Sequence, residues 1–329
     1  MAVRQGWKRA VGGVFALPAR AIEPIMLRVQ KTIGAKRMPW LFLVPNLTAV
    51  LLFSLLPVGI NVFYSLTGSD RLYPSERPYV GSENFATLFD CASYLDPSSC
   101  RADLFWRAVR NTMVFVPVQV VCMIGVSLLA AICLNRKIRG RGFFRAIFFF
   151  PVMLSPVVVA LTWQWILQRN GALNGLLNAL GLPGANWLAF PDTAFFWTVF
   201  VTVWAHMGFY TIMLLAGLQS IPGDVYEAAR MDRASTWRVF SRITVPLLKP
   251  VLLVVFVLCV IRSVQTFDEL YVLTGGGPGS ATMLIVQYIY EVGFAVQPRN
   301  FGLAAAASLI LGVVLLIFTA VQLRLSRNS

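Results

Sequence analysis

Long runs of apolar residues alternate with shorter polar stretches along most of this chain. Six runs are long enough to cross roughly 30 Å of hydrocarbon at about 1.5 Å per helical residue. They are predicted at residues 40–66, 105–134, 143–167, 194–221, 247–270 and 303–323. Kinks are expected at Pro57, Pro117, Pro151 and Pro156, where proline interrupts helical hydrogen bonding. The pattern predicts an all-α membrane protein with six transmembrane helices.

The polar stretches alternate in charge, which predicts the topology independently of hydropathy. Residues 1–38, 135–146, 222–249 and 324–327 together hold 20 of the 28 basic residues. The stretches between them hold 10 of the 14 acids, namely Asp70, Glu76, Glu83, Asp90, Asp96, Asp103, Asp192, Asp268, Glu269 and Glu291. Because basic loops stay on the cytoplasmic side, both termini are predicted to be cytoplasmic.

Composition supports the membrane prediction and changes the meaning of the net charge. Hydrophobic residues make up 57% of the chain and charged residues 13%, with a mean hydropathy of +0.70. Soluble domains carry about a quarter charged residues. The net charge of +14 is spread between apolar runs rather than gathered on one polar domain, so it indicates topology and not nucleic-acid binding.

The predicted organisation is a basic cytoplasmic N-terminal segment at 1–38 and a six-helix transmembrane domain at 39–329. Residues 1–38 hold eight basic residues and one acid but no long apolar core, so they are not predicted to be a cleavable signal peptide. Residues 19–36 could form an amphipathic helix on the membrane, and a poorly ordered basic tail fits the same composition.

A charged segment at 222–246 lies between the fourth and fifth apolar runs. Three acids and four arginines between residues 224 and 243 prevent this segment from crossing a bilayer unpaired. Its apolar residues fall at helical spacing in two groups, which predicts two short amphipathic helices. Pro246 and Pro250 are expected to mark the turn into the fifth run. The apolar groups are Val225, Ala228, Ala229 and Met231, then Trp237, Val239, Phe240 and Ile243.

This segment resembles the EAA motif in permease subunits of bacterial ATP-binding-cassette (ABC) importers of the carbohydrate-uptake branch. The motif is EAA, three residues, Gly, nine residues, Ile, one residue and Leu-Pro. Here Glu227, Ala228 and Ala229 are followed by Arg233 at the glycine position, and Ile243 precedes Val245-Pro246. The spacing matches in full. Arginine in place of glycine puts the tight turn in question, because glycine adopts positive φ most readily.

The resemblance covers most of the chain from about residue 39, through segments such as FFFPVMLSPVVVALTWQW and FDELYVLTGGGPGSAT. It implies the type I importer fold and a non-catalytic subunit. ATP and Mg would be bound by a separate dimer of ATP-binding subunits and no cofactor by this chain. A second, homologous but non-identical permease subunit and an extracytoplasmic solute-binding protein are also implied. The whole would lie in the bacterial cytoplasmic (inner) membrane.

In such a subunit the EAA segment forms a coupling helix that docks in a groove of the ATPase. The resemblance implies that Ala228, Ala229 and Met231 pack in this groove and that Glu227 pairs with a basic group of the ATPase. Asp232 and Arg233 complete the predicted coupling set.

A sugar path would combine aromatic faces with amides or carboxylates. The candidates are Asn111, Gln119, Trp163, Gln164, Trp204, Tyr210, Gln265 and Asp268, and for each aromatic residue a packing or membrane-interface role is the more common one. Arg262 could pair with Asp268, pair with a partner subunit or reach the outer surface. Cys91 and Cys100 bracket a polar loop and could form a disulfide in an oxidising compartment.

The sequence contains no HExxH motif, no CxxC pair and no GxSxG motif, which are typical of catalytic or metal centres. His206 lies inside the fourth apolar run, where it is expected to pack or to line a pore rather than bind a metal. The glycine-rich segment at 275–280 lacks the lysine of a nucleotide-binding P-loop. Two other functions stay open, a secondary transporter or channel for a small polar solute and a membrane enzyme acting on lipid-linked sugars.

Overall fold

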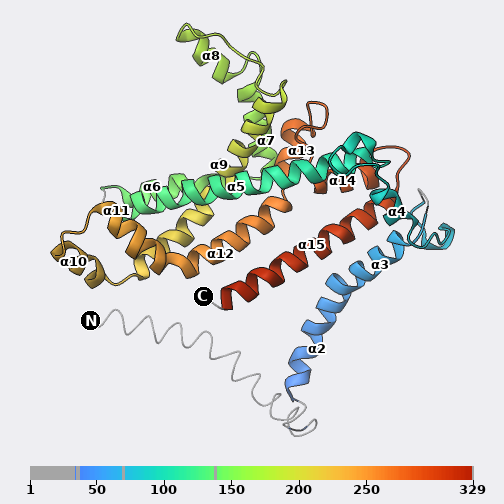
Figure 1. Ribbon diagram of the computed structural model, residues 1–329, viewed down its shortest axis with the longest axis horizontal. Coiled ribbons are helices and arrows are strands. Elements are labelled where there is room, and N and C mark those ends of the chain that lie inside the picture. Colours follow the sequence, from blue (N-terminus) through green and yellow to red (C-terminus); the bar gives the residue numbers. More distant parts are fainter. Residues whose placement is uncertain (1–33, 35–37, 69–70, 137–138, 328–329) are drawn as a thin grey trace, which may run out of the picture. The chain divides into compact units, whose positions relative to one another are not determined.

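The computed structural model describes residues 34, 38–68, 71–136 and 139–327 (Figure 1). Nearly all of the predicted N-terminal segment, together with Asp70 and Lys137, lies outside the described residues. The chain divides into two compact units, and the boundary between them in the sequence falls between Phe63 and Tyr64. Each unit is described by itself.

The first unit contains a long apolar helix interrupted by a π turn. Helix α2 (Met38–Val50) runs into the π turn η1 (Leu51–Leu55) and then into α3 (Leu56–Ser65). In the π turn, the amide of Leu56 donates to the carbonyl of Leu51. Pro57 follows directly, and the wider turn relieves the clash that its ring would make with a carbonyl four residues back. The apolar helix therefore continues through this proline.

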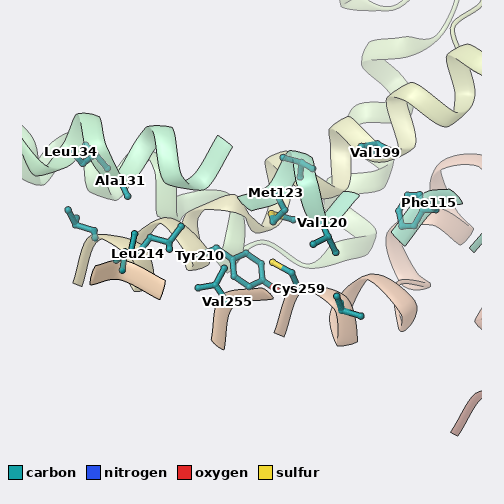
Figure 2. Close-up of a cluster of buried hydrophobic side chains, with 14 of the residues drawn as sticks. Phe115, Val120, Met123, Ala131, Leu134, Val199, Tyr210, Leu214, Val255 and Cys259 are labelled. Carbon is teal, nitrogen blue, oxygen red and sulfur yellow. The ribbon is translucent and has the colours of Figure 1, made fainter. Parts of the chain in front are cut away.

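The second unit is built around three long helices that lie side by side, α5 (Asp103–Asn135), α9 (Pro191–Ser220) and α12 (Val245–Val264) (Figure 1). Their facing side chains form the main apolar core, from which Tyr210 of α9 and Cys259 of α12 point toward one another (Figure 2). Helix α15 (Phe301–Arg327) packs mainly against smaller elements at one end of this unit. The core is formed by membrane-length helices, as expected for a bundle in lipid.

The third predicted span, at 143–167, is broken rather than kinked. Helix α6 (Arg141–Phe149) and the short 3-10 turn η4 (Phe150–Met153) end before α7 (Pro156–Leu167) begins, and the bend at the break is 99°. Ser155 is extended, with ψ 136°, because a residue before proline is disfavoured in the α region. Pro156 then begins α7, since proline fits the first turn of a helix. Helix α8 (Ala172–Ala179) follows.

The fifth span differs from its prediction at both ends. Residues 236–243 do not form a separate short helix, because α11 (Thr236–Val239) continues through the π turn η5 (Phe240–Thr244) directly into α12. The π turn again ends two residues before a proline, Pro246, so this proline does not mark a turn of the chain. Pro250 lies inside α12. At the other end α12 stops at Val264, and the separate helix α13 (Asp268–Thr274) follows.

The remaining predicted spans agree with the structure to within a few residues. Five helices in the described ranges are long and apolar enough to cross a membrane, and six spans result if the bent pair counts as one. Isolated β-bridges occur, but the described residues form no β-strand. The five helices are Pro39–Ser65, Asp103–Asn135, Pro191–Ser220, Thr236–Val264 and Phe301–Gln322. The prediction of an all-α membrane fold is confirmed.

A folded loop connects α3 to α5 in the second unit and contains α4 (Glu83–Phe89). Arg77 anchors this loop. Its guanidinium is buried, donates to Thr67 Oγ1 at 2.9 Å and lies over the ring of Tyr64, 4.5 Å from the centroid. A buried arginine is tolerated here because its donors are satisfied and the aromatic face attracts its charge.

Candidate functional site

The charged segment between the fourth and fifth spans forms a compact helical corner. Helix α10 (Gly223–Met231) begins after Pro222, with Asp224 in its first turn and Arg230 in its last. Both charges complement the helix dipole. The hydroxyls of Tyr226 on α10 and Thr244 in η5 are 3.3 Å apart and connect the two arms of the corner.

The end of α10 answers the question raised by arginine at the glycine position. Arg233 adopts the left-handed conformation, with φ 49°. Its amide donates to the carbonyl of Arg230 at 3.0 Å, and the amide of Ala234 donates to the carbonyl of Ala229 at 3.0 Å. This pair of hydrogen bonds is the Schellman motif, which normally has glycine at the left-handed position. The turn is therefore formed with arginine, at the cost of a strained backbone.

The apolar residues expected to face an ATPase divide between two faces of α10. Ala229 is only 6% exposed, so it packs inside this chain. Met231 is 85% exposed, and Glu227 and Ala228 are exposed as well. The outward face of α10 therefore contains Glu227, Ala228 and Met231, without Ala229.

Trp237 is a further exposed apolar residue at this corner. It lies in α11, is 73% exposed and packs only partly on Phe240, with ring centroids 5.7 Å apart. The sequence pattern placed Trp237 on the apolar face of a short helix and did not single it out for binding. Its position one residue after the start of α11 at Thr236, directly beyond the corner, is the signal that could have identified it.

The charged residues of the corner make no ion pair with one another. The ion pairs found in the described part of the chain are Arg71–Glu76 and Arg107–Asp103, and His206 Nδ1 lies 3.8 Å from Glu269 Oε1. Glu227, Asp232 and Arg233 belong to none of them and are exposed. These three side chains are therefore available for charge pairing with another protein.

The candidate path residues do not form one cluster. Asn111 donates its amide hydrogens to the carbonyls of Ser280 at 2.7 Å and Met283 at 3.1 Å, so it holds the glycine-rich loop. Gln119 is 1% exposed in α5, and its Oε1 has no hydrogen-bond partner. Tyr210 lies in the apolar core (Figure 2).

The two candidate tryptophans, Trp163 and Trp204, lie together where α7 packs against α9. Trp163 of α7 contacts Trp204, with ring centroids 5.5 Å apart, and also packs against Trp197 and Phe200. Both candidate tryptophans are partly buried, and Gln164 beside Trp163 is partly buried too. These edge-to-face and tilted contacts are typical of aromatic packing.

Gln265 and Asp268 lie at the break between α12 and α13, and both are exposed. Arg262, one turn earlier, does not pair with Asp268. Its Nη2 is 2.9 Å from His206 Nε2 instead. The C-terminal end of α12 therefore presents a polar group of side chains.

A polar network links three helices at this end of the second unit. His206 on α9 has Nδ1 3.0 Å from the carbonyl of Thr202 and 3.8 Å from Glu269 Oε1. The side chain of Glu269 on α13 is 2% exposed. Since Nδ1 faces acceptors and Nε2 faces the guanidinium of Arg262, the imidazole proton belongs on Nδ1. Sequence reasoning placed His206 in a packing or pore role but did not connect it to Glu269.

The loop opposite α10 is closed by a disulfide between Cys91 and Cys100. Asp96 caps the 3-10 turn η3 (Pro97–Ser99) by accepting from the amide and the hydroxyl of Ser98, at 3.1 and 2.6 Å. These hydrogen bonds lower the pKa of the exposed Asp96 carboxyl below its usual value of 3.8. The loop is thus fixed by both covalent and polar contacts.

No group of three or more potential metal ligands occurs within the described ranges. Taken together, the apolar helices and the exposed charged corner define a membrane-embedded transport subunit with a surface suited to a partner protein. Comparison with known proteins identifies the family. The chain belongs to the binding-protein-dependent transport system inner membrane component family, whose model matches residues 123–328.

Individual relatives agree with this family. The trehalose/maltose transport system permease protein MalF of Thermococcus litoralis is 38% identical over 295 residues, which cover 88% of this chain and 94% of that protein. The lactose transport system permease protein LacF of Rhizobium radiobacter is 32% identical, with the same two coverages. The resemblance to an ABC importer permease, made on the EAA spacing, is confirmed.

Solved structures share the fold. A chain in the crystal structure of a bacterial ABC transporter involved in the import of the acidic polysaccharide alginate matches with a TM-score of 0.76 and 25% identity. The match covers 92% of this chain and 99% of that chain. A second chain, from an alginate ABC transporter in complex with a pentasaccharide-bound periplasmic protein, matches at a TM-score of 0.75 and 24% identity. Because its identity is only 24%, the second match supports a shared fold and nothing further.

Proposed function

We propose that this chain is one of two permease subunits of an ATP-driven importer for a carbohydrate or related glycoside. The main observation in support of this proposal is the exposed corner formed by α10. It joins α9 to the helix that leads into α12, so a force applied to α10 acts on two membrane helices at once. ATP binding by a partner would then shift the importer between outward-open and inward-open states.

The partner for α10 is a dimer of ATP-binding subunits, which bind ATP and Mg. Glu227, Ala228 and Met231 provide an apolar patch with a charge at its edge, which suits insertion in a groove. Trp237 extends the patch, and Asp232 and Arg233 add unpaired charges. The family membership supports this assignment, and this chain itself is proposed to be non-catalytic and to bind no cofactor.

The second permease subunit is proposed to be a homologous, non-identical chain. An extracytoplasmic solute-binding protein would deliver the substrate to the acid-rich loops, including the loop closed by Cys91 and Cys100. The distribution of charge supports this topology, with both termini and α10 on the cytoplasmic side of the bacterial inner membrane. A carbohydrate substrate is supported by relatives named as permeases of trehalose/maltose, arabinooligosaccharide and lactose transport systems.

The proposed substrate path passes the polar outer end of α12, where Arg262, Gln265 and Asp268 are exposed. Amide, carboxylate and guanidinium groups can all bind sugar hydroxyls. Asn111 and Tyr210 are weaker candidates than the sequence suggested, because their side chains are used inside the chain.

Charge reversal at Glu227 tests the coupling role. In the complete importer reconstituted in vesicles, Glu227→Lys should weaken binding of the ATP-binding subunit about tenfold or more and reduce ATP-driven uptake in parallel, because a partner's basic group would then face a like charge. Glu83→Lys, an equal charge reversal on the exposed start of α4, serves as the control and should leave that binding unchanged.

Two results would count against the proposal. Unaltered binding and uptake in the Glu227→Lys importer would remove the coupling role from α10. Uptake driven by a proton gradient in vesicles without ATP would favour a secondary transporter instead.

A further inference from the structure

Two arginines at the start of α6 converge on one amide of α9. Arg141 and Arg145 lie one helical turn apart, so their side chains share a face of α6. The surroundings of Gln219, near the end of α9, orient its amide so that the oxygen faces both guanidiniums. In this orientation it accepts from Arg145 Nη2 at 2.8 Å and from Arg141 Nη2 at 2.5 Å. Three side chains from two helices thus form one polar cluster, which we call the Arg141 cluster.

The Arg141 cluster carries two positive charges and no negative one. Neither arginine forms an ion pair with a carboxylate among the residues that the structure describes. The surrounding segment at 135–146 contains five basic residues and no acid. The Nε atoms of both arginines are enclosed and have no hydrogen-bond partner. Two guanidiniums one turn apart repel each other, so an anion shared between them would stabilise the pair.

The same short helix also exposes apolar side chains close to the cluster in sequence. Phe143, Phe144 and Ile147 are all exposed large hydrophobic residues of α6. In a membrane-embedded protein, such residues at the end of a span face acyl chains, while the first turn of the span reaches the headgroups. The cluster therefore lies where lipid phosphate groups and lipid tails are both within reach.

We propose that Arg141 and Arg145 bind the phosphate of an anionic phospholipid, with its acyl chains against the exposed face of α6. Guanidinium forks match phosphate oxygens in geometry, and basic pockets between membrane helices are suited to anionic headgroups. The phosphate would supply the acceptor that Gln219, a neutral amide, provides only in part. Because Gln219 lies near the start of α10 in sequence, an occupied site would also brace the corner that α10 forms.

Native mass spectrometry of the importer, purified in detergent with its copurifying partners, tests this site. Phosphatidylglycerol is the probe, and phosphatidylcholine is the neutral comparison. The double variant Arg141→Gln/Arg145→Gln should bind phosphatidylglycerol about tenfold more weakly or worse, since both charge-assisted contacts to the phosphate are lost. The matched control Arg136→Gln/Arg139→Gln removes the same charge from exposed positions and should change binding less than about threefold.

A second variant separates the lipid site from a folding defect. Gln219→Glu keeps the side-chain length and supplies a carboxylate that both arginines can bind, so it should release the lipid to a similar extent without removing either arginine. Equal phosphatidylglycerol binding by the wild type and Gln219→Glu would overturn the proposal. So would an equal loss in the control variant, equal retention of phosphatidylcholine, or displacement of the lipid by inorganic phosphate alone.

Discussion

Replacement of Arg233 by glycine should strengthen the turn that ends α10. An L-residue in the left-handed helical region costs roughly 1–2 kcal/mol. Glycine avoids this cost but loses more conformational entropy on folding, by roughly 0.5–1 kcal/mol. The difference leaves a net stabilisation of about 0.5–1 kcal/mol, which corresponds to roughly two- to fivefold less local opening.

Hydrogen–deuterium exchange of the assembled importer measures this opening directly. The amides of Arg233 and Ala234 donate to carbonyls of α10 at 3.0 Å, so their exchange reports whether the turn is closed. In Arg233→Gly the amides at positions 233 and 234 should exchange about two- to fivefold more slowly than in the wild type. Peptides that cover residues 223–236 provide the readout.

Two variants decide whether the backbone angle or the charge is responsible. Arg233→Ala removes the guanidinium but keeps an L-residue at φ 49°, so its exchange should stay near that of the wild type. Arg230→Gly places glycine within the helix and should speed exchange, because glycine costs about 1 kcal/mol there relative to alanine. Equal slowing in Arg233→Gly and Arg233→Ala would refute the argument from backbone strain.

Three further predictions concern other parts of the chain. Trp237→Ala should weaken binding of the ATP-binding subunit about tenfold or more in a titration, because exposed aromatic anchors dominate interfaces, and unchanged affinity would exclude Trp237 from the interface. Gly208→Ala should lower the thermal unfolding temperature of the importer, because the added methyl carbon would lie 2.1 Å from the carbonyl oxygen of Phe148. Such overpacking costs about 1–3 kcal/mol, and an unchanged unfolding temperature would contradict this close approach. The lowered pKa of Asp96 means that its cap stabilises the loop above the usual pKa and that this stabilisation is lost as the pH falls through the lower folded value. Protection of the Ser98 amide should therefore fall with acid in the wild type and stay low and pH-independent in Asp96→Ala, which has no side-chain acceptor.

The length of the apolar runs was enough to predict most of the membrane helices, but the effect of each proline on a helix could not be predicted. The first, second, fourth and sixth spans were predictable because a run of apolar residues leaves the helix as the one local way to satisfy the backbone in lipid. Pro246 was expected to mark a turn into the fifth span, yet a π turn accommodates it within a continuous helix, whereas Pro156 begins a helix after a 99° bend. Sequence alone does not separate these two outcomes, since neighbouring helices decide which carbonyls find partners.

The coupling corner was predictable in position but not in detail. Motif spacing located α10, and the exposed Glu227 and Met231 agree with an outward face. The inward direction of Ala229 depends on how α10 packs back on its own chain, which helical spacing does not determine. The network of His206 and Glu269 joins residues more than 60 positions apart, so no local pattern could have indicated it.

The absence of a break between α11 and α12 has a mechanical consequence. The helix from Thr236 to Val264 has 29 residues, or about 43 Å at about 1.5 Å per residue. A rod of this length turns a small tilt at Trp237, near one end, into a displacement of Arg262 at the other. The hydrogen bond from Arg262 to His206 is therefore placed to respond to movement at the far end of the same helix.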